Sequence, residues 1–469
     1  MLARFDDLIA MNTLAEKFAD FSVGLKFEDL PASVVHEVKR RVIDSMGCAL
    51  GAWHAEPCVL AREVASTFSA RSGSTLLGTR HQAPPDWAAF ANGCLVRYFD
   101  YNDTYLSKEP AHPSDNIPAA LAVAEAGNAN GRELITAIAL AYEVQCRLCD
   151  TASLRARGWD HVTYGAFSSA LAAARLMGLD GERTRHAVGI AGVASAALRQ
   201  SRVGELSHWK GCAFANAARH GVFAALLARA GMTGPAPIFE GEKGFEKLVS
   251  GPLHDLKLPT AGSGLRKDDF MILKTHIKFW PAEYHSQSAI EAALKLRTQI
   301  SDPADIESVL VESHDAAVDI IGSEPEKWRP TSRETADHSL PYIVAATLTD
   351  GEVTAKQFAP ERFADPKLLT LVKRVKVERH PELSARYPEA VGNIVTTRLS
   401  KGRVFSERVD YPRGHARNPL SDAEVEAKFH NLADAVLGQE RAEAVLRSLW
   451  RLDEACEWRT LISSIEVSG

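Results

Sequence analysis

The spacing of hydrophobic residues predicts helices from the start of the chain to about residue 265. Alanine-rich segments, with apolar residues three and four positions apart, are separated there by glycine and proline. One helix is expected to begin at Pro118, a favourable first helical position, and to end at Gly127 as a C-cap. Further helices are expected over residues 132–149, 164–177 and 214–230. The abundant alanine indicates that these helices pack closely.

Between about residues 270 and 410 the pattern includes strands as well as helices. Hydrophobic and polar residues alternate over 308–313 (SVLVES) and 374–378 (RVKVE), which is typical of strands with one buried face. Residues 393–399 and 403–409 predict a β-hairpin. The sequence SDAE at 421–424 is a capping box that predicts a final helical stretch reaching the low 460s.

These patterns predict a mainly α protein with an inserted α+β domain. Residues 1–268 and 409–469 would together form a large all-helical domain, and residues 269–408 would form a smaller α+β lid domain. The length of 469 residues is sufficient for two hydrophobic cores without stabilising disulfides or metals.

Composition removes several classes of function. The net charge of -6 gives no basic bias, so we expect no nucleic-acid partner and no attraction to anionic lipid. The amino terminus lacks a signal peptide pattern, and the most apolar stretches are shorter than the ~20 residues of a membrane span. The sequence therefore predicts a cytoplasmic protein with no membrane segment.

No cofactor or metal is expected from the sequence motifs. The seven cysteines are scattered, and Cys146 and Cys149 form a CxxC inside a helical pattern with no second pair to complete a zinc site. We therefore expect them to pack in a core. The chain also lacks GxGxxG, GxxxxGK[ST], HExxH and GxSxG motifs, which disfavours nucleotide and zinc chemistry.

Polar residues are densest in the segment 97–116, RYFDYNDTYLSKEPAHPSDN. Turn formation is a sufficient explanation for Asp103, Ser114 and Asp115. Asp100 differs because its neighbours are aromatic, and a desolvated carboxylate needs a partner, for which His112 is a candidate.

Other candidates lie in three later segments. His161 follows Asp160 in GWDHVTYG, where Asp160 read alone is an N-cap. Lys210 and Lys278 stand among apolar and aromatic residues, although a lysine that extends to the surface is the alternative for each. The segment RETADHSLPY offers Asp337, His338 and Tyr342, and the last two would share a helical face at i, i+4 spacing.

A family resemblance joins these clusters. The segments that carry it are, in chain order, FDYNDT, HPSDN, GWDHVTYG, HWKGCAFANAARHG, IKFWPAEYHSQSA, ETADHSLPY and YPRGHARNP. They resemble the MmgE/PrpD family, which includes 2-methylcitrate dehydratases and cis-aconitate decarboxylases. The resemblance implies a homodimer of chains, each with a helical domain and an α+β lid. The HPSDN segment and its spacing from Asp100 resemble the dehydratase branch more closely.

The resemblance also implies which residues form the active site. The catalytic positions carried over by motif are Asp100, His112, His161, Lys210, Lys278 and Tyr342. The residues expected to bind substrate are Asn102, Asp103, Thr104, Arg199, His285 and His338. Arg199 is included because its planar guanidinium suits a carboxylate.

The implied function is a hydro-lyase that dehydrates 2-methylcitrate, and potentially citrate, to 2-methyl-cis-aconitate without metal. Removing a proton beside a carboxylate builds negative charge there, so a base and nearby cations are required. We expect His161 or Lys210 to transfer protons and Lys278 to hold a carboxylate. Asp100 would orient His112, and Tyr342 or His112 would protonate the departing hydroxyl. The alternatives are a decarboxylase or epimerase of a related acid, and a catalytically silent helical scaffold.

Overall fold

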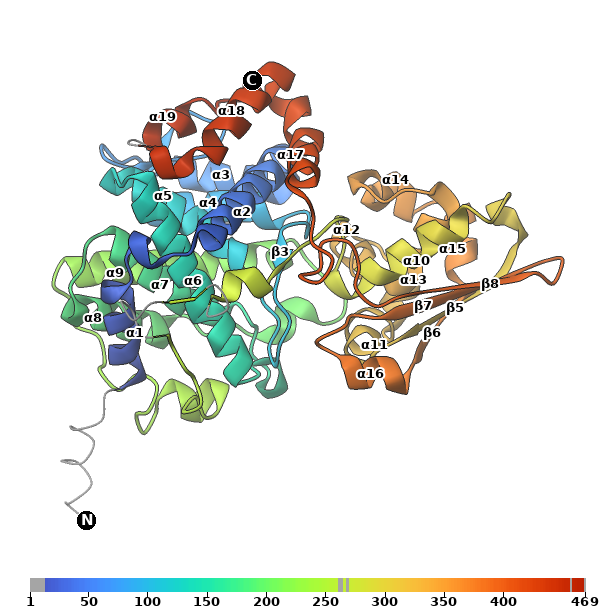
Figure 1. Ribbon diagram of the computed structural model, residues 1–469, viewed down its shortest axis with the longest axis horizontal. Coiled ribbons are helices and arrows are strands. Elements are labelled where there is room, and N and C mark those ends of the chain that lie inside the picture. The colour runs from blue at the N-terminus through green and yellow to red at the C-terminus, as the bar shows by residue number, and fades with distance from the viewer. Residues whose placement is uncertain (1–12, 260–264, 267–269, 456–457, 468–469) are drawn as a thin grey trace, which may run out of the picture.

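The protein is mainly helical and carries one four-stranded mixed sheet (Figure 1), as the sequence patterns predicted. The computed structural model describes residues 13–259, 265–266, 270–455 and 458–467. The described residues form several hydrophobic clusters, and the two largest are separate from each other. One is built from residues within 14–277 and 420–465, which we call the helical body, and the other from residues within 280–409, which we call the sheet lobe. The expected domain boundary at 268/269 and Cys456 fall outside the described residues.

The helical body consists of long helices and short connecting elements. Its helices are α1 (Leu14–Gly24), α2 (Ala32–Gly51), α3 (Glu56–Ser66), α4 (Pro85–Arg97), α5 (Ile117–Gly127), α6 (Gly131–Thr151), α7 (Thr163–Leu176), α8 (Gly181–Ala194), α9 (Trp209–Arg229), α17 (Asp422–Leu437), α18 (Gln439–Trp450) and α19 (Trp458–Ser463). Its short helical turns are η1 (Phe27–Asp29), η2 (Pro113–Asn116), η3 (Arg155–Arg157), η4 (Arg199–Arg202), η5 (Glu246–Ser250), η7 (Met271–Lys274) and η12 (Leu452–Glu454). Its strands are β1 (Ser74–Thr75), β2 (Gln82–Ala83), β3 (Asp103–Thr104) and β4 (His276–Ile277).

Small residues allow the central helices α4, α6, α7 and α9 to pack closely, as the alanine content indicated. A Cβ atom on Gly221 of α9 would lie 2.6 Å from the carbonyl oxygen of Ala166 in α7, so only glycine fits there. Cys146 and Cys149 are fully buried in α6, which confirms their place in the core. Ser421 caps α17 as predicted, whereas α5 ends in left-handed Asn128 and not in a Gly127 cap.

The sheet lobe contains the inserted strands and shorter helices. Its helices are α10 (Gln287–Arg297), α11 (Asp315–Ile321), α12 (Arg333–Ala336), α13 (Leu340–Asp350), α14 (Pro360–Phe363), α15 (Pro366–Val372) and α16 (Pro381–Arg386), with the turns η8 (Tyr284–Ser286), η9 (Pro303–Asp305), η10 (Pro325–Trp328) and η11 (Ala355–Phe358). Its strands are β5 (Ile306–Ser313), β6 (Val375–Arg379), β7 (Asn393–Leu399) and β8 (Val404–Val409).

The strands form a sheet in the order β6-β5-β7-β8. β5 is parallel to β6 and antiparallel to β7, with Val311 opposite Val377 and Val395. β7 and β8 form the predicted antiparallel hairpin. Burial alternates along β7 because one face packs against α10 and the other faces outward, while α13 packs against β6 (Figure 1).

The chain leaves the helical body for the sheet lobe just after β4, which pairs with β3. Asp103 lies opposite Ile277, and Thr104 lies opposite His276. This short ladder brings the polar segment after α4 beside the chain that leads into the sheet lobe. Within the described residues, the structure contains no helix that is both long and apolar enough to cross a membrane.

Candidate active site

A polar cavity lies between the helical body and the sheet lobe. It is lined by side chains from both: Arg97, Asp100, Thr104, Leu106, Pro110, His112, Arg155, His161, Arg199, Arg202, Leu206, Glu283, Tyr284, His285, Ile320, Lys327 and His338. Most of the predicted site residues contribute to this lining or contact a residue that does. The excess of arginine and histidine suits an anionic ligand.

Asp100 is the centre of the charged network. Lys278 donates from Nζ to the carbonyl oxygen of Asp100 at 2.8 Å and to its Oδ1 at 2.7 Å, and Arg97 pairs with the same carboxylate. The β3–β4 ladder explains why Lys278 reaches a residue so distant in sequence. Burial opposes ionisation, but Arg97, Lys210 and Lys278 hold the pKa of Asp100 well below its usual value.

The backbone at Asp100 has a left-handed conformation, with φ of +50°. Aspartate adopts this region less readily than glycine, and such conformations cluster at functional sites. The turn lies directly after α4, so it lets the Asp100 side chain fold back toward Arg97 at the helix end.

Lys210 is buried in the first turn of α9, which begins earlier than the sequence predicted. Its Nζ lies 3.5 Å from Oδ2 of Asp100 and 3.7 Å from Oδ1 of Asp337, and it makes no hydrogen bond within the described residues. Burial lowers the pKa of Lys210 to about 8, so its ammonium holds its proton weakly.

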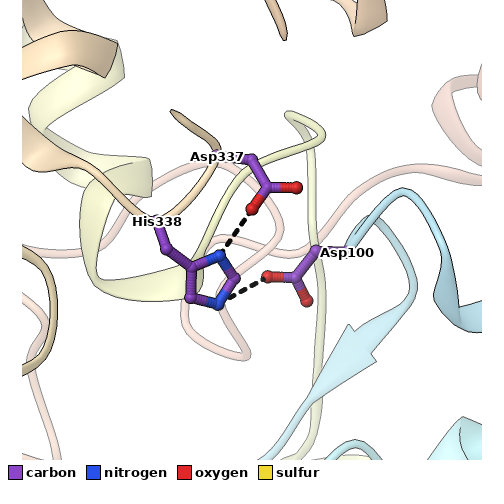
Figure 2. A group of neighbouring side chains, drawn as sticks. All are labelled: Asp100, Asp337 and His338. Atoms are coloured by element: carbon purple, nitrogen blue, oxygen red, sulfur yellow. Dashed lines mark hydrogen bonds and ion pairs between the residues drawn. The ribbon is translucent and has the colours of Figure 1, made fainter. Parts of the chain in front are cut away.

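His338 lies between the carboxylates of Asp337 and Asp100 (Figure 2). Its Nδ1 donates to Oδ1 of Asp337 at 2.6 Å, and its Nε2 lies 3.5 Å from Oδ2 of Asp100. Burial and the nearby Lys210 ammonium lower the pKa of His338 to about 4. The imidazole is therefore neutral at neutral pH.

His161 has one ring nitrogen fixed and one free. Its Nδ1 lies 2.9 Å from Oδ1 of Asp160, while its buried Nε2 has no hydrogen-bond partner in the part of the chain described. Burial lowers the pKa of His161, so the ring is neutral with Nε2 available to accept a proton. Asp160 was expected to cap a helix, but the cap residue of α7 is Val162, which makes no side-chain capping hydrogen bond. The Asp160 carboxylate accepts from the N–H of Val162 at 3.3 Å and also orients this histidine.

Arg202 connects the histidine side of the cavity to the lysine side. Its Nε donates to Oδ2 of Asp160 at 2.9 Å, and its Nη1 donates to the carbonyl oxygen of Lys210 at 3.1 Å. Arg202 thus positions the partner of His161 and the first turn of α9 together.

His112 lies beside His161, with their ring centroids 5.7 Å apart. Its Nδ1 donates to the carbonyl oxygen of Asp103 at 2.7 Å, because a carbonyl can only accept. The expectation that Asp100 orients His112 is therefore wrong, since the cations around Asp100 occupy its carboxylate. Burial, with Arg97 and Lys278 nearby, lowers the pKa of His112 well below its usual value.

Of the three predicted binding residues near β3, one lines the cavity and two form hydrogen bonds inside the core. Thr104 lines the cavity. Asn102 donates to Oδ1 of Asp115 at 2.6 Å, and Asp103 accepts from the Ser114 backbone at 2.9 Å and from the Tyr142 hydroxyl at 2.6 Å. Asn102 and Asp103 therefore shape the loop from inside the core and do not line the cavity.

Arg199 and His285, by contrast, both line the cavity. Nδ1 of His285 donates to Glu283 at 2.6 Å, and its Nε2 lies 3.2 Å from the hydroxyl of Tyr387. Both ring nitrogens of His285 are therefore held by neighbouring side chains at the sheet-lobe side of the cavity.

The structure places Tyr342 outside the site. Its hydroxyl donates to the carbonyl oxygen of Gln357, and its ring lies near Phe358 in the core of the sheet lobe. Tyr342 and His338 do not share a helical face, because α13 begins at Leu340 with Ser339 as its cap. The family motif located this tyrosine in the chain, but packing directs its side chain away from the cavity.

Several site residues were not predicted. They are Arg97, Arg155, Arg202, Glu283 and Lys327, which line the cavity. Asp337, a candidate from the sequence without an assigned role, orients His338. The sequence could have indicated two of the unpredicted residues, since Arg97 is three residues before Asp100 and Glu283 is two residues before His285. Arg155 and Lys327 follow no pattern that separates them from surface residues.

Asp100, Asp337 and His338 have the geometry of a metal-binding group, with ligand atoms all within 4.8 Å of one another (Figure 2). However, Lys210 contacts both carboxylates, and Arg97 and Lys278 contact Asp100. A divalent cation would meet the repulsion of these positive charges. The arrangement suits ammonium and guanidinium groups better than a metal ion.

The charge network leads to a stability prediction for Asp100→Asn. This change leaves Arg97, Lys210 and Lys278 buried with one counter-charge fewer. We expect the free energy of unfolding to fall by about 3–5 kcal/mol, as for other broken buried ion pairs. Urea unfolding at pH 7 measures this. Asp319→Asn, which affects an exposed pair with Arg379, is the control, and an equally small effect at Asp100 would contradict the network.

Comparisons with known proteins agree with this arrangement. Residues 16–255 match the MmgE/PrpD N-terminal domain, and residues 280–452 match the MmgE/PrpD C-terminal domain. A 2-methylcitrate dehydratase of Salmonella typhimurium is 32% identical over 404 residues, which cover 80% of this chain and 81% of that protein. The 2-methylcitrate dehydratase of Escherichia coli (strain K12) is 30% identical over 407 residues, with the same coverage of 80% and 81%.

A relative with a different activity also aligns. The cis-aconitate decarboxylase of Mus musculus is 28% identical over 462 residues, which cover 95% of this chain and 91% of that protein. These relatives are enzymes, and each alignment covers at least 80% of this chain and 81% of the relative. Because family models match both parts of the chain and close relatives align over most of it, the protein belongs to the MmgE/PrpD family.

Proposed function

We propose that the protein is a hydro-lyase that dehydrates 2-methylcitrate to 2-methyl-cis-aconitate, with citrate as a second candidate substrate. The observation that carries the proposal is a neutral histidine with a free Nε2 in the same cavity network as a buried lysine with a pKa of about 8. A base and a weakly held proton are the two groups that an elimination of water needs. The 2-methylcitrate dehydratases at 30% and 32% identity support the substrate.

In this mechanism Nε2 of His161 removes the proton beside a substrate carboxylate. The C–H electron pair forms the carbon–carbon double bond, and the C–O bond breaks on the neighbouring carbon. Asp160 stabilises the imidazolium that forms, because its carboxylate contacts Nδ1. His112 lies beside His161 with Nε2 also directed away from its backbone partner and is a second position for the proton.

Lys210 donates the proton that converts the departing hydroxide into water. Its weak hold on that proton follows from burial, and its Nζ lies near the carboxylates of Asp337 and of Asp100, which lines the cavity. Lys278 and Arg97 act through Asp100, because both bind its carboxylate. This role differs from the expectation that Lys278 binds a substrate carboxylate directly. The negative charge that develops on the substrate carboxylate is stabilised by the remaining cavity cations.

The reaction is proposed to proceed without metal, because the cluster with ligand geometry found among the described residues is already compensated by Lys210 and Lys278. The test follows the ultraviolet absorbance of the conjugated acid formed from 2-methylcitrate, with and without chelator. We expect the same rate in both samples. No absorbance would overturn the dehydratase proposal, and a rate abolished by chelator would overturn the metal-free mechanism.

The same assay separates the rival activities. Carbon dioxide release from cis-aconitate would identify a decarboxylase, the activity named for the mouse relative. Exchange of substrate hydrogen without an absorbance change would identify an epimerase. A chain that turns over none of these acids would be the silent helical scaffold.

A homodimer is proposed from an exposed apolar face of the helical body. Leu198 is 65% exposed, Trp209 is 48% exposed and Phe223 is 49% exposed, and a groove runs between Leu198 and Trp209 along α9. Large apolar patches of this kind mark protein interfaces, where tryptophan is enriched. A second copy on this face would cover the helix that carries Lys210.

We expect Trp209→Glu to convert the dimer to a monomer, because it places a charge in an apolar interface. Sedimentation velocity at micromolar concentration measures the change. Phe68→Glu, at a 40% exposed aromatic residue of a different segment, should leave the dimer intact. A wild-type monomer, or a Trp209→Glu dimer, would contradict the assignment of this face.

We further propose that the sheet lobe acts as a lid over the cavity, with domain limits at 268/269 and 408/409. The separate cores and the cavity between them support this division. The cytoplasm is the proposed location, which the free thiols of Cys48, Cys58, Cys94, Cys146, Cys149 and Cys212 support.

A further inference from the structure

Two arginines lie where the cavity continues into a second cleft between the helical body and the sheet lobe. Arg155 and Arg199 line both the cavity and this outer cleft, together with Ile320. Across the cleft stand Tyr387 and Ser384 of the sheet lobe. The two guanidinium groups therefore stand at the outer end of the candidate active site.

Backbone hydrogen bonds fix the two arginines in place. Arg155 belongs to η3, and its N–H donates to Oε2 of Glu109 at 3.0 Å. Arg199 belongs to η4, and its N–H donates to the carbonyl oxygen of Gly158 at 3.0 Å. A bridge between Trp159 and Leu198 joins the two segments. Both positions are thus held by main-chain contacts that leave the side chains uncommitted.

Neither guanidinium has a hydrogen bond or ion pair with another side chain of the described residues. The other cavity arginines differ, because Arg97 pairs with Asp100 and Arg202 pairs with Asp160. Burial lowers the pKa of Arg199, and the positive charge of Arg155 adds to this effect. Partly buried like charges without a paired anion favour the binding of one.

The nearby carboxylates do not supply that anion. Glu109 is fully buried and its charge opposes the lowering of the Arg199 pKa, but it forms no ion pair with either guanidinium. Its Oε2 accepts from the N–H of Arg155 and from the Ser153 hydroxyl. Across the outer cleft, Asp315 and Asp319 both pair with Arg379. A carboxylate of the ligand would complete the arrangement with planar, two-pronged hydrogen bonds.

We propose that Arg155 and Arg199 clamp the substrate carboxylate that is farthest from Lys210, so that the site selects tricarboxylates over dicarboxylates. This specificity role rests on the proposed function and deepens it. The inner carboxylates lie near the reacting carbon, and the outer carboxylate extends toward the cleft. Lys327, buried in the sheet lobe and paired with Glu324 at 3.4 Å, lines the same cavity.

The test compares two acids that cannot be dehydrated because they lack a hydroxyl group. Tricarballylate carries three carboxylates, and succinate is the same skeleton without one carboxymethyl arm. Titration calorimetry gives the affinity of each acid for the wild type, Arg155→Gln and Arg199→Gln. We expect each substitution to weaken tricarballylate about 10- to 100-fold, the range of a hydrogen bond to a charged group, and to change succinate less than about 3-fold.

Matched variants sharpen this result. Arg157→Gln removes a neighbouring exposed arginine that does not line the cavity and should leave both affinities unchanged. Arg199→Lys keeps the charge but loses the planar fork, so it should fall between wild type and Arg199→Gln. Equal losses for both acids, or no loss for tricarballylate, would overturn the clamp.

Turnover separates this inference from the proposed function. In Arg155→Gln and Arg199→Gln, the KM for 2-methylcitrate should rise about 10-fold or more while kcat changes little, since the clamp lies away from the reacting bond. If no acid is dehydrated but the arginine-dependent preference for tricarballylate holds, the clamp stands and the dehydratase proposal fails. If dehydration proceeds with an unchanged KM in both variants, the clamp fails alone.

Discussion

Replacement of His161 by glutamine should lower kcat for 2-methylcitrate dehydration by roughly 10²- to 10⁴-fold, the usual contribution of a positioned general base. Glutamine keeps much of the volume and the polarity of the side chain but cannot take the proton. The free Nε2 of His161, with Nδ1 fixed by Asp160, is the reason for this expectation. Initial rates from product absorbance, with circular dichroism to verify folding, measure the effect.

Two further variants define the role of His161. His254→Gln changes an exposed histidine outside the cavity and should leave kcat unaltered. Asp160→Asn should give an intermediate loss, because it removes the charge that stabilises the protonated ring. A His161→Gln enzyme with near-normal kcat and intact fold would remove His161 from the mechanism.

Replacement of Lys210 by methionine should produce a comparable loss, roughly 10²- to 10⁴-fold in kcat. Methionine fills a similar space in the buried pocket but supplies neither charge nor proton. The wild-type kcat/KM should fall as pH rises above about 8, because the ammonium with its lowered pKa then loses the proton that it must donate. Below pH 8 this group is in its active, protonated form.

Lys210→Arg tests the assignment of that alkaline limb. An arginine stays protonated to above about pH 12, so the fall in kcat/KM near pH 8 should disappear while the maximum rate remains low. The exposed Lys243 supplies the control substitution Lys243→Met, which should retain the wild-type profile. An alkaline limb that persists unchanged in Lys210→Arg would assign it to another group.

The sequence predicted the mainly α class with a small sheet because the helical spacing and the strand alternation both match the elements of the structure. The Ala-rich periodicity gave α5, α6, α7 and α9 to within a few residues, and the alternation over 393–409 gave the β7–β8 hairpin. The change near residue 270 from helical spacing to a mixture of strand and helix patterns lies close to where the chain leaves one hydrophobic core and enters the other. These features depend on local periodicity, which a single sequence contains.

The sequence predicted several residues of the site but not the contacts between them. Asp100, His161, Lys210 and Lys278 do converge, since Lys278 and Lys210 both contact Asp100 and Arg202 links Lys210 to the partner of His161. Motif order alone could not show that Lys278 binds Asp100. That contact depends on the β3–β4 ladder between segments far apart in the chain.

The errors have a common physical cause. Tyr342 follows a matching motif, but the core of the sheet lobe takes its ring and Gln357 takes its hydroxyl. His112 is oriented by a backbone carbonyl, and Asp160 by its side-chain partners, not by a helix end. The direction of a side chain is set by tertiary packing, which the spacing of residues in sequence does not contain.

The central claim is that Lys210 and His161 face one bound tricarboxylate. A crystal structure of the wild-type protein with tricarballylate tests it directly. We expect Lys210 Nζ to face the central carbon, which carries the hydroxyl group in 2-methylcitrate, and His161 Nε2 to face a methylene carbon. The outer carboxylate should lie between Arg155 and Arg199. A ligand bound outside this cavity, or one that touches neither Lys210 nor His161, would contradict it.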